Sequence, residues 1–326
     1  MHKTGSTALQ TYLSSEKFDD WHYVSLGNPN HSIAMYTLFS EDYMSYPLWK
    51  KAGFDEKKII ELRNSFKQNM HEQLSNESTK NFILSAESVG LLKDIEKEAL
   101  LKYLISHDLI ISVICYVREP KSYAYSTFQE NVKAGITDLK NEYDPRYYHR
   151  LNYFNSNNDV SCLKVKNFHH LKNNSIIDDF LSTFSMKSER TTNSLENSRL
   201  TISSLKILHH LNKIFKCTGN YEKFFQVRIE FISFLEDCFA HDKRKYEELF
   251  NLHYITKEIN YLSTTYDICF NSKVCDYRSN SSALSFLNDL SDLCKEGLNK
   301  LCLEYGVSMQ PSDLEKTLDK IAYKLV

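Results

Sequence analysis

Two short apolar runs, separated by a helical pattern, stand out in the first 120 residues. They are residues 81–85 and 109–117, which are rich in strand-favouring apolar side chains and do not alternate between apolar and polar positions. Parallel strands that are covered on both faces have this pattern. Between the runs, apolar residues recur at helical spacing over residues 95–106. The order strand, helix, strand predicts a βαβ unit and therefore a parallel sheet with right-handed crossovers.

The rest of the pattern is mostly helical. Residues 3–13 are expected to be a loop that turns into a helix, and residues 24–32, which contain Gly, Asn and Pro, are expected to be irregular. A third strand is expected at residues 160–165. Further helices are predicted at 33–48, 54–77, 122–134, 176–184, 201–215, 221–239, 243–250 and 283–305.

These elements predict an α/β fold in which a parallel sheet of a few strands is flanked by helices. Residues 1–215 are expected to form the α/β domain. Residues 216–326 are expected to form a helical C-terminal region, either separate or part of the same domain. The Ser-, Asn- and Thr-rich residues 188–198 are the candidate boundary or loop.

Charge and cysteine usage narrow the class of protein. The 326 residues carry 40 Lys and Arg against 42 Asp and Glu, which argues against a dedicated nucleic-acid-binding protein. The 8 Cys form no CxxC pair, so no metal-ligand spacing is present. The N-terminus is polar and no run of about 18 apolar residues exists, so we expect neither a signal peptide nor an integral membrane segment. Free thiols are typical of a reducing, cytoplasmic setting.

The first candidate for chemistry is the N-terminal sequence His-Lys-Thr-Gly-Ser-Thr-Ala-Leu-Gln at residues 2–10. A glycine flanked by hydroxyl side chains at a helix start offers backbone N–H groups, hydroxyl donors and the positive end of the helix dipole. Lys3 adds a full charge, and the set suits a phosphate or sulfate group. It is not a Walker motif, because Lys3 precedes Gly5 and the second glycine is absent. The same pattern also fits a capped surface helix.

The second candidate is the sequence from Val117 to Phe128, in which Arg118 leaves a predicted strand and Ser126 follows on the next helix. The guanidinium fork and the hydroxyl could converge on one anion. Alternatively, Arg118 pairs with Glu119 or with a helix C-terminus and has only a structural role.

Together, the two segments resemble those of sulfotransferases that use 3′-phosphoadenosine 5′-phosphosulfate (PAPS), in the bacterial, carbohydrate-type branch of that family. The resemblance extends over about residues 1–215. It is supported by the sequences at 30–32, 83–87, 163–168 and 179–181. It implies a sheet like that of P-loop nucleotide-binding proteins.

The resemblance also implies roles for individual residues. Lys3 would stabilise the bridging oxygen as it leaves, and either Glu87 or His31 would be the general base. Each candidate base also has a structural alternative, Glu87 as a helix N-terminal carboxylate and His31 as part of a turn. The donor's 5′ end would be held by Lys3, Thr4, Gly5, Ser6 and Thr7, and its 3′-phosphate by Arg118 and Ser126.

The function implied is transfer of a sulfuryl group from PAPS to a hydroxyl or amine of a glycan or small-molecule acceptor, without a metal. One alternative is another P-loop transferase, such as a small-molecule kinase that needs magnesium and ATP. A second is an inactive binding protein that retains the fold. In this family a strand runs into the donor loop, and here the chain starts at the loop. We therefore expect the first strand to be missing, because the chain is a fragment or starts at an internal Met. Such a truncation would leave the donor loop poorly anchored and could make the chain inactive.

Two further groups have mainly structural explanations. The adjacent histidines His209 and His210 diverge by about 100° if they lie on a helix, which favours structural roles. The aromatic-rich residues 143–154 could stack on a sugar or on adenine, or could simply belong to the core.

Overall fold

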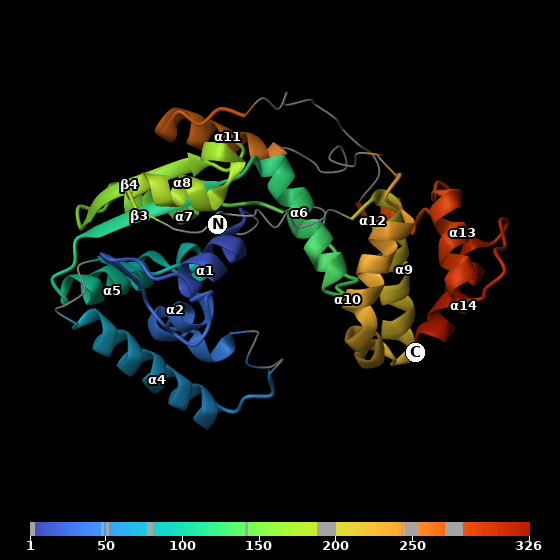
Figure 1. The fold of residues 1–326 in the computed structure, drawn as a ribbon, viewed down its shortest axis with the longest axis horizontal. Coiled ribbons are helices and arrows are strands. Elements are labelled where there is room, and N and C mark those ends of the chain that lie inside the picture. Colours follow the sequence, from blue (N-terminus) through green and yellow to red (C-terminus); the bar gives the residue numbers. More distant parts are fainter. Residues whose placement is uncertain are drawn as a thin grey trace. The chain divides into compact units, whose positions relative to one another are not determined.

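The structure of the chain is a computed structural model that describes residues 4–46, 49, 52–76, 81–140, 143–187, 200–242, 244, 253–270 and 283–326. These residues form an α/β fold that is mostly helical and contains small parallel sheets flanked by helices (Figure 1). The chain divides into two compact units that interleave along the sequence. The first unit consists of Met1–Glu119, Arg146–Leu195 and Asn260–Cys269, and the second of Pro120–Pro145, Glu196–Ile259 and Phe270–Val326.

The first unit contains all the strands of the described residues. The strands are β1 (Trp21–Tyr23), β2 (Asn81–Ile83), β3 (Ile111–Val117) and β4 (Val160–Asn167). The helices around them are α1 (Ser6–Ser15), α2 (Ser32–Phe39), α4 (Glu56–Leu74), α5 (Asp94–Ile105), α7 (Tyr147–Ser156) and α8 (Ile176–Thr183). Short 3₁₀ helices are η1 (Tyr43–Ser45), η2 (Glu87–Leu91) and η3 (Lys172–Asn174).

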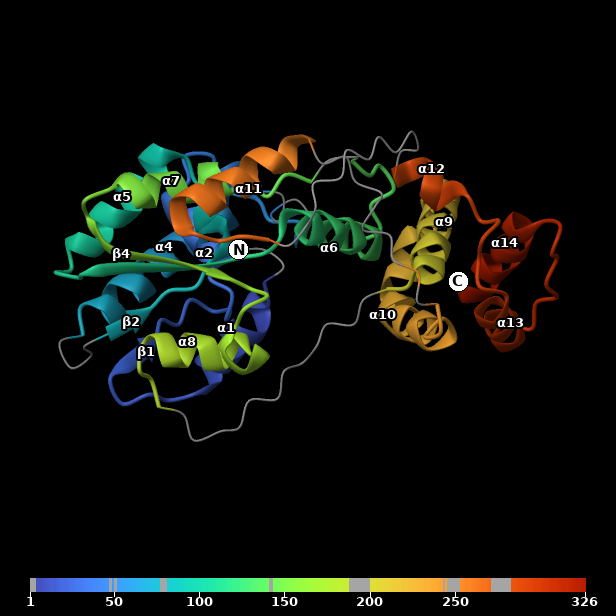
Figure 2. The same ribbon diagram turned by 90° about the horizontal axis from the view of Figure 1, so that it is seen from above.

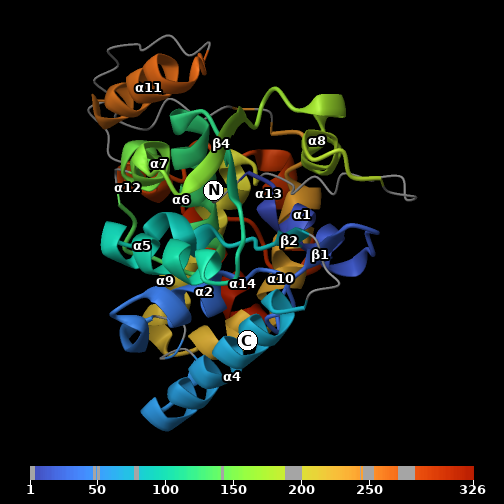
Figure 3. The ribbon, with the colours of Figure 1, turned by 90° about the vertical axis from the view of Figure 1, so that its left-hand side faces the viewer.

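Helices cover both faces of the parallel pair β3–β4. Ile111 and Val113 pack with α5 and α7, whereas Ile114 and Tyr116 pack with α1 and α8. Figures 2 and 3 show these two pairs of helices on opposite sides of the strands. Side chains alternate between the faces of a strand, so a strand that is covered on both faces needs apolar residues at nearly every position. The prediction of parallel strands flanked by helices is confirmed here, but burial is partial, because β3 has one exposed residue and β4 has no buried residue.

The strands form two separate parallel pairs rather than one sheet, and this differs from the expected βαβ sheet. Among the described residues, β2 pairs with β1, from Trp21↔Asn81 to Tyr23↔Ile83, and β3 pairs with β4. The strand β1 was not predicted, because three residues are too few for a strand pattern to be distinguished. Both pairs nevertheless share a core, since Ile83 of β2 and Tyr116 of β3 belong to one apolar cluster beneath α1.

Most predicted helices are confirmed, with shifted ends. The predicted helix at 33–48 ends at Phe39, and the predicted helix at 283–305 is two helices, α12 (Ala283–Asn288) and α13 (Lys295–Glu304). The predicted helix at 243–250 lies, apart from Arg244, outside the described residues, as does the predicted boundary at 188–198. The sequence pattern did not predict α7, α11 (His253–Tyr266) or α14 (Leu314–Leu325).

The second unit is helical. It contains α6 (Pro120–Lys133), α9 (Ile202–Thr218), α10 (Tyr221–Cys238), α12, α13 and α14, and α11 crosses from this unit into the first. It therefore includes α6 and α9, which the sequence-based scheme assigned to the first domain. Its core is built around α9, whose Leu205, Leu208 and Leu211 are fully buried. No helix in the described ranges is both long and apolar enough to cross a bilayer.

Charged groups explain why α12 and α13 do not form one helix. The buried Lys206 donates hydrogen bonds to the Asp289 carbonyl (2.6 Å) and the Asp292 carboxylate (2.5 Å), both in the link between the helices. Arg244 joins Asp292 to Asp242. Burial alone would raise the pKa of Asp242, but hydrogen bonds from Arg244 and Ser203 outweigh it and hold this pKa well below its usual range. The buried cation thus requires a non-helical link that turns acceptors toward it.

The buried His209 on α9 generates a prediction about stability and pH. Within the described ranges neither of its ring nitrogens has a hydrogen-bond partner, and burial, with Lys213 and His210 acting in the same direction, lowers its pKa to about 4. The unfolded chain, with a histidine pKa of about 6.5, takes up the proton first as pH falls. We expect His209 to reduce the free energy of unfolding by about 3 kcal/mol between pH 6.5 and 4.

Denaturant unfolding at several pH values would test this effect. His209→Leu should lose much less stability than the parent protein over this pH window, whereas His170→Leu, at an exposed site, should follow the parent. Equal losses in all three proteins would contradict the assignment.

Candidate functional site

The turn before α1 requires a glycine. Gly5 is the N-cap of α1 and has a φ of 71°, in the left-handed region, where its carbonyl accepts the N–H of Leu9 (3.2 Å). A Cβ at this position would lie 3.3 Å from the ring of Phe168 and 3.4 Å from a methyl group of Ile176. Both the backbone conformation and the close contact exclude a side chain here.

The other residues of the predicted donor loop are in different environments. Thr4 is buried, Ser6 is half-buried and Thr7 is exposed. Lys3, the predicted cation of this loop, lies outside the described residues, as does His2. Ser6 is the first residue of α1, where backbone N–H groups have no partner within the helix.

One face of α1 is hydrogen-bonded to the segment that follows β2. The Ser6 hydroxyl donates to the Glu87 carboxylate, and the Gln10 amide donates to the carbonyl (3.3 Å) and hydroxyl (3.1 Å) oxygens of Ser85. Ser6 and Gln10 are four residues apart on a helix, and Ser85 and Glu87 are two apart on an extended segment, so each pair lies on one side of its element. The structure therefore brings the predicted base Glu87 together with the predicted donor loop.

The backbone at Glu87 is held independently of its side chain. The N–H groups of Glu87 (2.9 Å) and Ser88 (3.3 Å) donate to the hydroxyl oxygen of Ser32, at the start of α2. The Ser88 hydroxyl donates in turn to the Ser32 carbonyl (2.8 Å). These contacts hold the main chain at Glu87 without involving its half-buried carboxylate.

His31, the rival base, is only 1% exposed and supports the same segment. Its Nδ1 accepts the N–H of Ser85 (3.1 Å), and its own backbone N–H donates to the Ser85 carbonyl (3.0 Å). Burial lowers the pKa of His31 to about 4, although the backbone of Val24 acts in the opposite direction. The ring is therefore neutral at pH 7, with its proton on Nε2, since Nδ1 accepts a hydrogen bond. In this tautomer His31 has no free basic nitrogen, which favours Glu87 as the base.

Arg118 follows β3 and is 8% exposed. Its backbone is fixed by Tyr147, whose hydroxyl donates to the Arg118 carbonyl (2.6 Å) and accepts the Arg118 N–H (3.1 Å). The carbon at the centre of its guanidinium lies 5.8 Å from the centre of the Phe168 ring. Phe168 is also the residue against which Gly5 packs. The two predicted anion-binding segments of the first unit therefore converge on one aromatic ring.

Ser126, the second residue predicted at the 3′-phosphate, is half-buried on α6 and belongs to the second unit. Its pairing with Arg118 stays a prediction. Gln10, Ser32, Ser85 and Phe168 lie in segments quoted for the motif or the resemblance, but the sequence assigned them no role of their own. The aromatic residues at 143–154 contribute Tyr147, which is fully buried and supports Arg118 through its hydroxyl.

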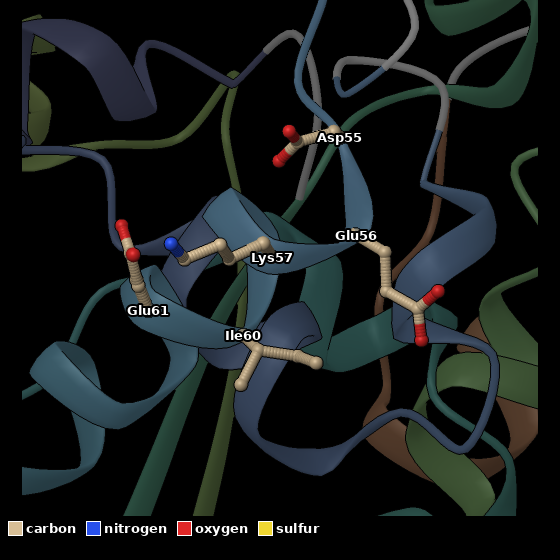
Figure 4. Close-up of a pocket in the computed structure, with 5 residues that line it drawn as sticks. All are labelled: Asp55, Glu56, Lys57, Ile60 and Glu61. Atoms are coloured by element: carbon tan, nitrogen blue, oxygen red, sulfur yellow. The ribbon is translucent and has the colours of Figure 1, made fainter.

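One surface hollow of about 490 Å³ lies at the N-terminal end of α4. Figure 4 shows that it is lined by Asp55, Glu56, Lys57, Ile60 and Glu61. It contains none of the predicted site residues, and its mostly acidic lining does not suit an anionic donor. The part of the chain that the structure describes holds no group of three or more His, Cys, Asp or Glu arranged for a metal ion.

Comparisons of this chain with protein-family models, with curated proteins and with solved structures found no match.

The Gly5 turn can be tested against a second glycine of positive φ. Gly27 has a φ of 82° and nothing within 4 Å of a Cβ added to it. Gly27→Ala should therefore cost only the left-handed strain, about 1–2 kcal/mol of unfolding free energy. Gly5→Ala should cost about 1 kcal/mol more, because Phe168 and Ile176 must also move. Denaturant unfolding of both variants measures the difference, and equal costs would show that the contact with Phe168 is not restrictive.

Proposed function

We propose that this protein transfers a sulfuryl group from PAPS to a hydroxyl group of a carbohydrate acceptor. The observation that carries the proposal is the shared position of Phe168, which contacts Gly5 of the donor loop and lies beside the Arg118 guanidinium. The donor has two anionic ends, a 5′-phosphosulfate and a 3′-phosphate. The chain has two segments predicted to bind anions, and Gly5 of one and Arg118 of the other lie near the same aromatic ring.

The proposed 5′ site has the donor groups that a phosphosulfate needs. The first turn of α1 supplies N–H groups and the positive end of the helix dipole, and Ser6 supplies a hydroxyl. Gly5 lets the backbone turn close to Phe168 without a side chain in the way. Lys3, by resemblance, adds the positive charge. These groups fit an anion with several oxygens.

Arg118 provides the proposed 3′ site. A guanidinium binds a phosphate through two parallel hydrogen bonds, which a hydroxyl or a backbone amide cannot do. Tyr147 fixes the main chain from which the side chain extends. A 3′-phosphate distinguishes PAPS from ATP, so we assign the choice of donor to Arg118.

The reaction is an in-line displacement at sulfur. The acceptor oxygen forms a bond to sulfur while the bond between sulfur and the bridging oxygen breaks. The electron pair of that bond stays on the 5′-phosphate of adenosine 3′,5′-bisphosphate. Glu87 takes the proton from the acceptor hydroxyl, and Lys3 stabilises the charge on the leaving oxygen. The contact between Ser6 and Glu87 supports this assignment, because it puts the base next to the proposed sulfuryl position.

An aromatic pair beside Glu87 supports a carbohydrate acceptor. Tyr36 lies one turn after Ser32 on α2, on the face that carries the contact to η2, and its ring stacks on that of Tyr46 with centres 4.6 Å apart. Burial, Tyr36 and Glu87 all raise the pKa of Tyr46, so its hydroxyl stays protonated. Aromatic faces with protonated hydroxyls suit the apolar faces and hydroxyls of a sugar ring.

Calorimetric titration with adenosine 3′,5′-bisphosphate tests the donor site. The bisphosphate should bind more tightly than ATP, which has no 3′-phosphate. Arg118→Ala should weaken its binding by about a hundredfold, the loss expected for a bidentate, charge-assisted contact. Lys102→Ala removes one exposed positive charge on α5 and should leave binding unchanged.

Thermal unfolding of each variant shows whether it is folded. No binding of the bisphosphate by the folded parent protein would sink the sulfotransferase proposal. Tighter binding of ATP with magnesium would favour a kinase instead.

A further inference from the structure

The N-terminus of α1 has a carboxylate that comes from elsewhere in the chain. Its N-cap is a glycine, and its first turn contains no acidic residue. Other helices are capped by their own side chains, which accept a first-turn N–H; these caps are Asp55, Ser175, Thr201 and Asp313. At α1, the carboxylate of Glu87 from η2 supplies the negative group, and it accepts a hydrogen bond from the Ser6 hydroxyl.

This contact uses a group that the proposed function assigns to the donor. A hydroxyl has one proton, so Ser6 cannot donate to the Glu87 carboxylate and to a phosphosulfate oxygen at the same time. A carboxylate and an anionic phosphosulfate at one helix N-terminus also repel each other. One of the two must leave when the other occupies this position.

We propose that Glu87 occupies the 5′ position of the donor site in the free protein and that the incoming phosphosulfate displaces it. This inference rests on the proposed function. The displaced carboxylate is then available to take the acceptor proton, so the base is released only when the donor is bound. Glu87 thus couples the two substrates, with the donor binding first.

The main chain at Glu87 does not depend on the contact with Ser6. Its main chain is held by the hydroxyl of Ser32, so rotation of the side chain alone breaks the contact with Ser6. The second hydrogen bond between α1 and this segment, from Gln10 to Ser85, does not involve the carboxylate. The helix can therefore stay docked while Glu87 turns away.

Donor affinity of a neutral variant provides the test. In Glu87→Gln the side chain keeps its size and a carbonyl acceptor for Ser6, but the competing charge is gone. Calorimetric titration should show adenosine 3′,5′-bisphosphate binding about tenfold more tightly than to the parent protein, although turnover falls with the loss of the base. Glu61→Gln, which removes one charge from the exposed face of α4, should bind as the parent does.

The alternative outcomes separate this inference from the proposed function. If the parent binds the bisphosphate and Glu87→Gln binds it equally or more weakly, the displacement is wrong and the proposed function stands. If no folded variant binds it, the proposed function fails as well. If Glu87→Gln does not fold, the bisphosphate affinity of Glu87→Asp provides the test instead. The shorter aspartate side chain keeps the charge but does not reach Ser6. The affinity of this variant should also exceed that of the parent, and an unchanged affinity would overturn the inference.

Discussion

The docking of α1 on the segment after β2 is the interaction on which the candidate site depends. Ser85 is at its centre, because it accepts hydrogen bonds from Gln10, donates its N–H to the His31 ring and accepts the His31 N–H at its carbonyl. A hydrogen bond of this kind contributes about 1 kcal/mol net, but a buried polar group left without one costs about 1–3 kcal/mol. Any other register between α1 and this segment would leave buried polar groups without hydrogen bonds. The free-energy cost of those groups is therefore what mainly specifies the register. That register brings Ser6 to Glu87.

The position of Arg118 follows from a second register, that of the parallel pair β3–β4. Val117 and Asn167 are paired at the ends of these strands, so the residues that follow them, Arg118 and Phe168, leave the same edge side by side. The Phe168 N–H donates to the Val117 carbonyl (2.8 Å) and continues the ladder by one step. Helices cover both faces of the strands, and parallel sheets covered in this way bind their ligands where the strands end. Arg118 lies at this edge, and through Phe168 it is joined to the turn at Gly5.

The elements that the sequence predicted are those whose patterns are set locally. Continuous apolar runs identified β2 and β3, and the Gly-Ser-Thr turn identified the start of α1. The pairing of strands could not be predicted, because β1 is three residues long and its partner lies about 60 residues further along the chain. The break between α12 and α13 depends on the buried Lys206, which reaches the link from another helix. The hydrophobic periodicity of residues 283–305 does not indicate this contact, because Lys206 lies outside that segment.

For the candidate site, the sequence indicated individual residues but not the hydrogen bonds and contacts between them. Glu87 was a candidate because it follows a strand, and only the fold shows that it accepts a hydrogen bond from Ser6. His31 was its rival because of its side-chain type, and the Ser85 N–H that determines its tautomer comes from another element. Phe168 had no distinguishing pattern, since an aromatic residue after a strand is usually core. These relations depend on contacts across many residues of sequence.

The electrostatics of the candidate site depend on its local charged and polar groups. With 40 basic and 42 acidic side chains the chain has little net field of its own, so an anion must be attracted by local groups. The backbone N–H groups in the first turn of a helix have no hydrogen-bond partner within the helix. Beside these groups in α1, a carboxylate from the same chain, that of Glu87, accepts a hydrogen bond from the Ser6 hydroxyl. If Glu87 occupies the donor position as we propose, it weakens donor binding by the amount that it stabilises the free protein, and its release would couple the binding of the two substrates.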